Sequence, residues 1–356
     1  MPCDLRSLRA ADRRQLVADA ASRLRAGELC VLPTETVYGL AVLPSHHEAV
    51  ARARALKGRP DEQPFTWHVA RRDDLSRFVP RPSKAITRLV QRYWPGPLTV
   101  VAPSAAGGTA GVRLPAHEFT REVIAAAGEP LWLSSVNRTG EPPLVDAAAI
   151  AERFAAHLGL VVDDGPSPLG VASTIVRHTG GKLEVLREGI LTAADVLHTA
   201  ADVILFVCTG NTCRSPLAEA IGRDIAARTL GVPRSDVLAH GFHFTSAGTG
   251  TLPDEPASAE SVLVAAELEL DLGSHRSRSV DPEMLERATW IVCLAQNHRR
   301  AILAEMPEVA PKVVMLRPDE RDVADPYGCD AKTYRRVRDE IRSAIGARMP
   351  GWLGKS

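Results

Sequence analysis

The spacing of apolar positions along the chain changes near residue 200. The first part mixes helical spacing with short apolar runs that Gly, Pro and Thr interrupt, which is typical of a mixed α/β fold. Gly27 follows the first helical segment, where a C-terminal stop is expected. The pattern predicts helices over 11–26 and 47–56 and strands over 160–163 and 173–176. The stretch ELCVLPTETVYGLAVLP, residues 28–44, is expected to form a short apolar strand, a turn around Pro33 and a second apolar segment.

The second part alternates apolar strands with helices. Residues 202–207 form a β-branched run typical of a buried strand, and a long helix is expected over 217–230. Further strands are expected over 290–294 and 312–316, with a closing helix over 331–347. Strands that alternate with helices predict a doubly wound parallel sheet. We therefore expect two domains, residues 1–198 and 199–356.

Composition narrows the class of protein. The chain has 43 Lys and Arg against 43 Asp and Glu, so its net charge of zero gives no bulk argument for nucleic-acid or membrane-surface binding. Six Cys in 356 residues are too few for a disulfide scaffold. No apolar run approaches the about 18 residues that a membrane helix needs, and the charged N-terminus does not resemble a signal peptide. We expect a cytoplasmic protein without membrane contact.

The stretch CTGNTCRSP, residues 208–216, carries the sharpest chemistry. It lies between a predicted buried strand and a predicted helix, so its backbone N–H groups and the helix N-terminus favour an anion there. Cys208 in that field is expected to ionise to a nucleophilic thiolate. Arg214 can grip two phosphate oxygens, and Ser215 can donate a hydrogen bond to the thiolate. This set predicts phosphoryl transfer through a phosphocysteine intermediate.

Such a reaction also needs a general acid for the leaving group. Asp325, in ADPYG, is the candidate; Pro326 would stiffen its loop and Tyr327 could wall the pocket. CTGNTCRSP together with ADPYG, TSAGT and SHRS resembles the low-molecular-weight protein tyrosine phosphatase family from about residue 202 onward. The resemblance implies that Cys208 is the nucleophile, Arg214 the phosphate clamp and Asp325 the general acid. It implies that the loop is formed or braced by Thr209, Gly210, Asn211, Thr212, Cys213, Ser215 and Ser246.

The target of this second domain stays open between two phosphoamino acids. Tyrosine-specific members usually have an apolar β-branched residue where this chain has Thr212, and CTGNTCRSP resembles the bacterial protein-arginine phosphatases. Those often have Phe after Asp-Pro, where this chain has Tyr327. Both phosphotyrosine and phosphoarginine therefore remain candidate substrates in a phosphorylated protein. The sequence also leaves open a catalytically silent module that docks phosphorylated partners.

The remaining cysteines bear on a third alternative. Arsenate reductases are related to this scaffold and need extra cysteines for a disulfide cascade, but Cys293 and Cys329 have no second Cys close behind them. Each of the two is interpreted as either a small buried apolar residue or an incidental thiol. Cys213 shares the loop with Cys208, and either a protective disulfide or a packing role fits it.

The first domain gives less from its residues alone. Hydroxyl groups cluster at Thr34, Thr36 and Tyr38, and neither a phosphate-binding P-loop nor a dinucleotide fingerprint occurs. His68 by itself is equally a hydrogen-bonded structural histidine. The ordered segments LPTETVYGLA, LKGRP, QPFTWHV, YWPGPLTVV, GGTAGVRLPAH, LSSVNRTGEPP, GVASTIV and LREG nevertheless resemble the YrdC-like threonylcarbamoyl-AMP synthase family along residues 10–191.

That resemblance implies an α/β domain with a twisted sheet around a basic cavity. It implies that L-threonine, bicarbonate and ATP, with Mg²⁺, become threonylcarbamoyl-AMP and pyrophosphate, which serves the machinery of tRNA t6A modification. No protein metal site is expected. By resemblance, threonine is held by Thr36, His68, Arg113 and Ser173. ATP is held by Lys57, Arg59, Gln63, Thr109, Ser135, Asn137, Val145 and Arg187.

Several positions depart from the usual family pattern. Gln63 stands where Asn is common, Trp67 where an aliphatic residue is common, and Val136 and Val145 where Ala and Thr are common. None of these changes removes a charged group. They leave open a silent nucleotide- or RNA-binding module in place of an active synthase.

Overall fold

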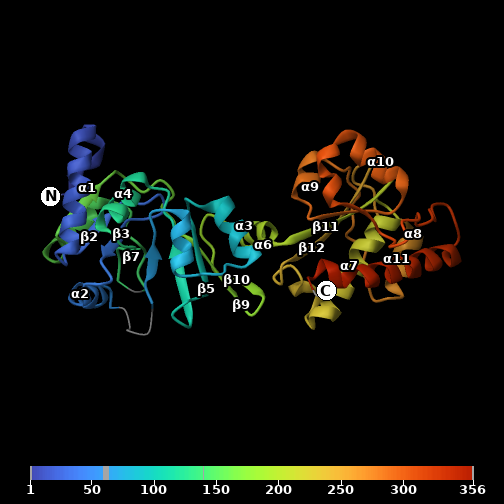
Figure 1. Ribbon diagram of the computed structural model, residues 1–356, viewed down its shortest axis with the longest axis horizontal. Coiled ribbons are helices and arrows are strands. Elements are labelled where there is room, and N and C mark those ends of the chain that lie inside the picture. The colour runs from blue at the N-terminus through green and yellow to red at the C-terminus, as the bar shows by residue number, and fades with distance from the viewer. Residues whose placement is uncertain (1, 59–63, 139, 355–356) are drawn as a thin grey trace. The chain divides into compact units, whose positions relative to one another are not determined.

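The protein consists of two compact units, residues 1–200 and 201–356, as Figure 1 shows. The division between the two units falls two residues later in the sequence than the boundary expected after residue 198. The structure is a computed structural model that describes residues 2–58, 64–138 and 140–354. No described helix is long and apolar enough to cross a bilayer.

The first unit is built on one mixed sheet. Its ten described strands follow the order β1-β8-β2-β3-β7-β4-β6-β5-β9-β10. The strands are Cys3–Asp4 (β1), Cys30–Leu32 (β2), Gly39–Val42 (β3), Thr66–His68 (β4), Leu98–Pro103 (β5), Thr109–Arg113 (β6), Leu131–Ser135 (β7), Leu160–Asp163 (β8), Thr174–Thr179 (β9) and Lys182–Arg187 (β10). The helices are Ala10–Arg25 (α1), His47–Lys57 (α2), Lys84–Tyr93 (α3), Glu118–Ala127 (α4), Ala147–Phe154 (α5) and Ala193–Ala200 (α6).

The alternation of side chains along a strand explains how helices cover both faces of this sheet. On β2, Cys30 and Leu32 pack with α1 and α4, whereas Val31 packs with α2 and α5. Figure 1 shows α1 and α4 on one side of β2 and β3, with α2 on the other. Helices α3 and α6 form a separate core over β5 and β9. The mixed α/β class predicted for this half is confirmed.

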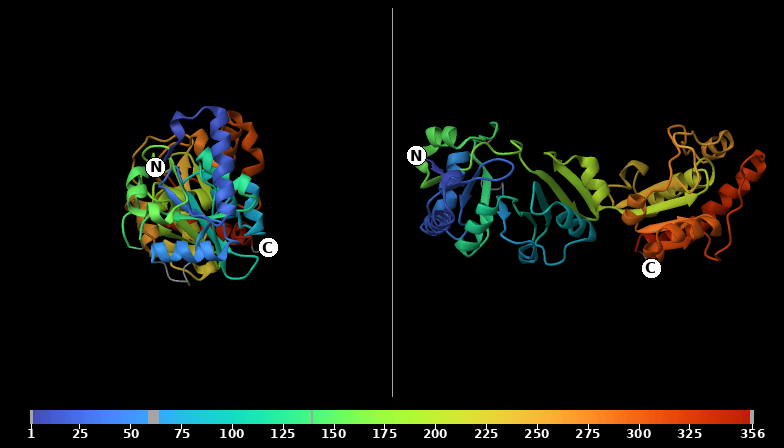
Figure 2. Two further views of the ribbon diagram at one scale, coloured as in Figure 1. Left: turned by 90° about the vertical axis from the view of Figure 1, so that its left-hand side faces the viewer. Right: turned by 90° about the horizontal axis from the view of Figure 1, so that it is seen from above.

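The second unit has a four-stranded sheet of order β12-β11-β13-β14, in which every pair is parallel. The strands are Asp202–Cys208 (β11), Phe242–Gly248 (β12), Trp290–Cys293 (β13) and Val313–Met315 (β14). The helices are Arg214–Leu230 (α7), Ala259–Ala266 (α8), Pro282–Arg287 (α9), Gln296–Glu305 (α10) and Ala331–Trp352 (α11). The predicted doubly wound parallel sheet is confirmed, and Figure 2 shows it from two further directions.

The register of this sheet positions the predicted phosphate loop. Ile204 and Phe206 pack towards α7 and α11, and Leu205 and Val207 pack towards α9 and α10, so β11 is buried on both faces. Cys208 pairs with Gly248 of β12 at the carboxyl edge. Ligands of doubly wound sheets bind outside this edge, next to the helix that follows the strand.

Candidate active sites of the two units

The thiol of Cys208 lies inside the loop that joins β11 to α7. It is 2% exposed, its Sγ lies 3.0 Å from Ser215 Oγ, and Asn211 donates its backbone N–H to Sγ over 3.3 Å. Both contacts supply hydrogen-bond donors to a thiolate, and the hydroxyl of Ser215 occupies the place that the sequence predicted for it. The nucleophile is therefore held by the same backbone that cradles an anion.

Asn211 fixes the shape of this loop. Its φ of 52° lies in the left-handed region, which Asn tolerates better than most residues. Its side-chain amide donates to Ser215 Oγ and Ser246 Oγ, and its carbonyl groups accept from Arg278 N and His275 Nε2. The strained residue thus has a partner for each polar group of its side chain. Asn211 and Ser246 meet as the sequence resemblance implied.

Gly248 allows β12 to approach the loop closely. A Cβ at this position would lie 2.3 Å from the carbonyl oxygen of Thr209 and 3.1 Å from the nitrogen of Asn211. Any side chain here would therefore push the loop away from the sheet. Ser246, two residues earlier on the same face, donates to Glu219 Oε2 at 2.8 Å and connects the loop to α7.

Arg214 and Asp325 meet as an ion pair. Arg214 is 5% exposed, and its Nη2 lies 2.6 Å from Asp325 Oδ2, while its Nη1 donates to the carbonyl of Val323. Its Nε is buried and has no partner in the described part of the chain. The guanidinium therefore still has a donor for an oxyanion, and the carboxyl group predicted to be the general acid contacts the predicted phosphate clamp.

The two neighbouring loop residues have different surroundings. Cys213 is buried, with its Sγ 3.3 Å from the hydroxyl of Tyr334 and 3.4 Å from that of Ser258. All six cysteines are free thiols. Thr212 is half-buried, and its hydroxyl contacts Cys213 Sγ at 3.6 Å. Burial raises the pKa of the Cys293 thiol to about 12, which suits an unreactive packing residue.

His298 is a residue at this site that sequence reasoning missed. It lies on α10, is fully buried, and its Nε2 lies 2.9 Å from the hydroxyl of Thr209. Burial and the charge of Arg214 lower the pKa of His298 to about 4, so the imidazole is neutral near pH 7. The only sequence signal was a histidine shortly after a buried strand, and its contact spans 89 residues of chain.

In the first unit, five of the predicted residues line one cavity of about 230 Å³. The cavity lies along the neighbouring strands β3, β7, β4, β6, β5, β9 and β10. These five predicted residues are His68, Ser135, Ser173, Arg113 and Arg187. Thr36 is buried beside them and accepts a hydrogen bond from Arg113 Nη2 at 2.8 Å. A small polar cavity with two guanidinium groups suits a small anionic substrate.

His68 presents an acceptor to this cavity. Its Nδ1 lies 3.1 Å from the carbonyl oxygen of Thr66, and a carbonyl can only accept, so Nδ1 carries the proton. Burial, with the charge of Arg113, lowers the pKa of His68 to about 3. The imidazole is therefore neutral and offers the lone pair of Nε2.

The remaining predicted ATP residues are distributed unevenly. The ammonium of Lys57 is buried and donates to the carbonyls of Ser135 and Asn137, so it fixes the end of β7 beside the cavity. Thr109 is exposed on the β5–β6 hairpin, and neither Thr109 nor Val145 lines the cavity. Arg59 and Gln63 lie outside the described residues.

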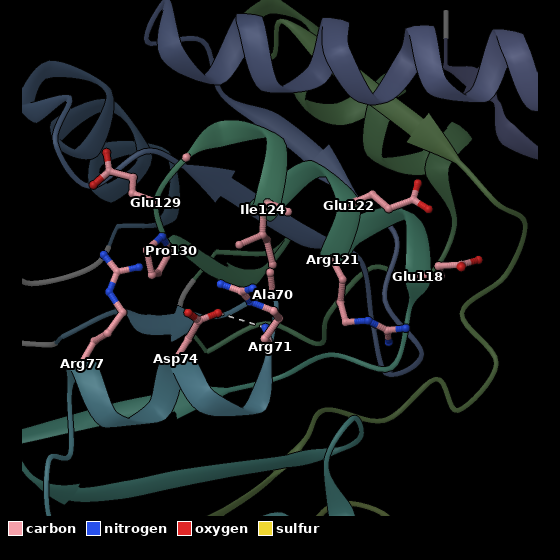
Figure 3. Close-up of a pocket in the computed structure, with 12 residues that line it drawn as sticks. Ala70, Arg71, Asp74, Arg77, Glu118, Arg121, Glu122, Ile124, Glu129 and Pro130 are labelled. Atoms are coloured by element: carbon pink, nitrogen blue, oxygen red, sulfur yellow. Dashed lines mark hydrogen bonds between the residues drawn. The ribbon is translucent and has the colours of Figure 1, made fainter.

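A second hollow of about 540 Å³ lies between α4 and the 3₁₀ turn Arg72–Arg77, as Figure 3 shows. Several of its charged groups have local partners. Asp74 accepts from the backbone of Arg71, Arg121 donates to the carbonyl of Pro115, and Glu122 pairs with Arg13. Within the described ranges, no group of three metal-ligating side chains lies together, here or elsewhere. We assign no ligand to this hollow.

Family models match both units. Residues 22–189 match the Sua5/YciO/YrdC model, described as telomere recombination, and residues 203–350 match the model of low molecular weight phosphotyrosine protein phosphatases. The chain is 33% identical over 163 residues to the threonylcarbamoyl-AMP synthase of Halorhodospira halophila, covering 43% of this chain and 84% of that protein. It is 32% identical over 146 residues to the protein-arginine-phosphatase of Geobacillus stearothermophilus, covering 40% and 90%.

The chain therefore joins two α/β domains that belong to different families. It belongs to the Sua5/YciO/YrdC family through its first unit and to the low molecular weight phosphotyrosine protein phosphatase family through its second. The threonylcarbamoyl-AMP synthase of Pyrococcus abyssi is 34% identical over 186 residues, which cover 50% of this chain and 55% of that protein. The chain thus spans about half the length of this longer relative. A structure of a doubly substituted Pyrococcus abyssi Sua5 shares the fold, with a TM-score of 0.52, 22% identity and 97% coverage of each chain.

Proposed function

We propose that the chain is a bifunctional enzyme. The first unit would be an L-threonylcarbamoyladenylate synthase, and the second a cysteine-dependent protein phosphatase. The single observation that carries the second activity is the buried Cys208 thiol within a backbone cradle, beside an ion pair of Arg214 with Asp325. For the first, it is a small cavity in which Arg113 and His68 offer a donor and an acceptor. A cytoplasmic location is part of this proposal, because all six cysteines are free thiols.

The phosphatase reaction would proceed in two displacements. The phosphoryl oxygens bind the loop N–H groups and Arg214, and the thiolate of Cys208 attacks phosphorus. The S–P bond forms while the bond from phosphorus to the leaving group breaks. Asp325, in its protonated form and no longer paired with Arg214, gives its proton to the leaving atom. Water then attacks the phosphocysteine, returns a proton to Asp325 and releases phosphate. Ser215 stabilises the thiolate as it leaves.

The synthase reaction would depend chiefly on positioning. Arg113 would contact the carboxylate of L-threonine, and Nε2 of His68 would accept from its amino group. The pKa of His68, about 3, makes it a hydrogen-bond acceptor and a poor base. The neutral amino group of threonine and bicarbonate would give the carbamate and water with no net release of a proton. The carbamate oxygen then attacks the α-phosphorus of ATP, and pyrophosphate leaves. The described residues offer no cluster of three carboxylate, histidine or cysteine side chains for Mg²⁺.

The decisive assay uses the full chain with both sets of substrates. Formation of the AMP adduct and pyrophosphate from L-threonine, bicarbonate and ATP tests the first activity. Release of phosphate from a phosphoarginine and a phosphotyrosine peptide tests the second. Absence of adduct under conditions in which another family member works would refute the synthase and leave a binding module. Absence of phosphate release from both peptides would leave a phosphate-docking module.

We expect Thr212→Ile to shift the choice between the two phosphopeptides. The hydroxyl of Thr212 is a polar group at the half-buried wall of the loop, and a branched apolar side chain there suits an aryl ring better than a guanidinium. The ratio of kcat/KM for phosphoarginine over phosphotyrosine should fall by about tenfold. Thr229→Ile, the same exchange at the far end of α7, is the control. An unchanged ratio would remove Thr212 from the argument.

Asp325→Asn should separate binding from turnover. Loss of the general acid lowers kcat by about 10²- to 10³-fold. The same change weakens the ion pair that occupies Nη2 of Arg214, so vanadate should bind more tightly than it does to the wild type. Vanadate titration and phosphopeptide turnover measure the two effects, with the exposed Asp254→Asn as control. Weaker vanadate binding in Asp325→Asn would show that the ion pair does not compete with the oxyanion.

A further inference from the structure

Most of the donors of Arg113 are already used. Its Nη2 donates to Glu35 Oε1 at 2.6 Å and to Thr36 Oγ1 at 2.8 Å, and its Nε donates to the carbonyl of Gly96 at 3.3 Å. No described residue accepts a hydrogen bond from Nη1. Arg113 lines the cavity and is 5% exposed, so one arm of a fixed guanidinium is left for a ligand.

The side chain of Glu35, like that of Arg113, is held in place by several hydrogen bonds. Its Oε2 accepts the backbone N–H of Ala116 at 3.0 Å, and its own carbonyl accepts from the backbone of Leu169 at 3.0 Å. Its side chain is 15% exposed, against 6% for that of Arg113. A carboxylate bound on both oxygens and at its backbone does not behave as a surface group that leaves when a ligand arrives.

We infer that Glu35 is the positioning residue for carboxylate recognition in the first unit: it occupies one edge of the Arg113 guanidinium and aims the free Nη1 arm into the cavity. The inference rests on the proposed synthase function. The substrate's carboxylate then meets a single arm of Arg113. Glu35 thereby favours an amino acid with a free α-carboxylate over its amide.

Charge in the cavity agrees with this role. Arg187 also lines the cavity, and burial together with the charge of Arg113 lowers the pKa of Arg187. Among the described residues, Glu35 is the carboxylate that pairs with Arg113, and no carboxylate pairs with Arg187. One fixed carboxylate against two guanidinium groups leaves one positive charge, which matches one substrate carboxylate.

The test uses the full-length Glu35→Gln variant. A glutamine amide can accept on one side only, so it cannot satisfy both Arg113 Nη2 and the N–H of Ala116, and the guanidinium loses its fixed direction. We expect the KM for L-threonine in pyrophosphate release to rise at least about tenfold, equal to about 1.4 kcal/mol. The inhibition constant of L-threonine amide and the KM for ATP should stay within about twofold, because neither ligand uses the α-carboxylate contact.

Glu184→Gln is the matched control. Glu184 pairs with Arg177 at 2.6 Å on the β9–β10 hairpin, so the exchange breaks an equally short ion pair elsewhere in the unit, and none of the three constants should change. A thermal melt checks folding; if Glu35→Gln does not fold, Glu35→Asp, which withdraws the carboxylate by one methylene, carries the same expectation.

The possible outcomes distinguish failure of the role inferred for Glu35 from failure of the proposed synthase function. An equal rise for threonine and its amide would make Glu35 a purely structural partner and overturn the inference, as would an unchanged KM for threonine. In both cases the synthase activity of the wild type would stand. A wild-type chain that releases no pyrophosphate with L-threonine overturns the proposed function, and the inference with it.

Discussion

Replacing Cys208 with serine is expected to lower phosphatase turnover by at least about 10⁴-fold. A serine hydroxyl is not ionised near neutral pH, so the displacement at phosphorus loses its nucleophile. The anion cradle keeps its other parts, because the N–H of Asn211 and the hydroxyl of Ser215 remain in place. Hydrolysis of an aryl phosphate and of the two phosphopeptides measures turnover, and vanadate titration measures the cradle.

Cys329→Ser is the control for this experiment, since Cys329 is an exposed thiol in the same unit. It should change neither turnover nor vanadate affinity. Unchanged turnover in Cys208→Ser would exclude a phosphocysteine mechanism. Loss of both turnover and vanadate binding, with a lowered melting temperature, would mean that the thiol holds the loop as well as attacking phosphorus.

The second large effect is expected from Arg113→Ala. Loss of the guanidinium removes the donor for the threonine carboxylate, so kcat/KM for L-threonine should fall on the order of 10²- to 10³-fold. ATP affinity should remain within about threefold. Pyrophosphate release at varied threonine and ATP concentrations measures both. A nucleotide-binding module without synthase activity would show no such dependence on Arg113.

The same exchange also affects stability, because Glu35 loses its buried partner. Leaving one member of a buried ion pair alone costs about 3–5 kcal/mol. Arg177→Ala breaks the more exposed pair with Glu184 and controls for the loss of an arginine. Equal losses in Arg113→Ala and Arg177→Ala would mean that stability, and not carboxylate recognition, explains the fall in activity.

The phosphate loop could be predicted because its parts are contiguous in the chain. The end of a buried strand, a short loop and the start of a helix carry the nucleophile, the cradle and the clamp within the nine residues 208–216, so local pattern suffices. The helix was predicted to begin at residue 217, whereas α7 begins at Arg214. The first turn of α7 is polar. It is buried by the sheet edge and the anion cradle, and a local sequence pattern does not show such contacts.

Strand β12 shows where local pattern failed. The sequence FHFTSAG gives a weak strand signal because Thr245 and Ser246 are polar, and this segment was not among the expected strands. Both polar side chains can be buried because each has a hydrogen-bond partner: Arg278 donates to Thr245, and Asn211 donates to Ser246. Polar side chains with partners distant in sequence can occupy a core position, and their partners are invisible to a local window.

Glu35 escaped notice for the same reason. A single acid among hydroxyl groups in PTETVYG looks like a solvated residue, and the arginine that binds it lies 78 residues away. Conversely, Thr109 and Val145 came only from family resemblance and lie outside the cavity lining. Residues that meet through the topology of the sheet become visible only once the strands are placed.

The left-handed Asn211 has one more consequence. Its amide and carbonyl groups have their partners before any anion arrives, so the loop already has the shape that it needs. Substrate binding therefore spends no free energy on folding the loop, and that energy remains available for the phosphoryl group itself. Loss of the contacts of Asn211 therefore affects the protein already in the absence of substrate: the loop becomes less rigid and the melting temperature falls.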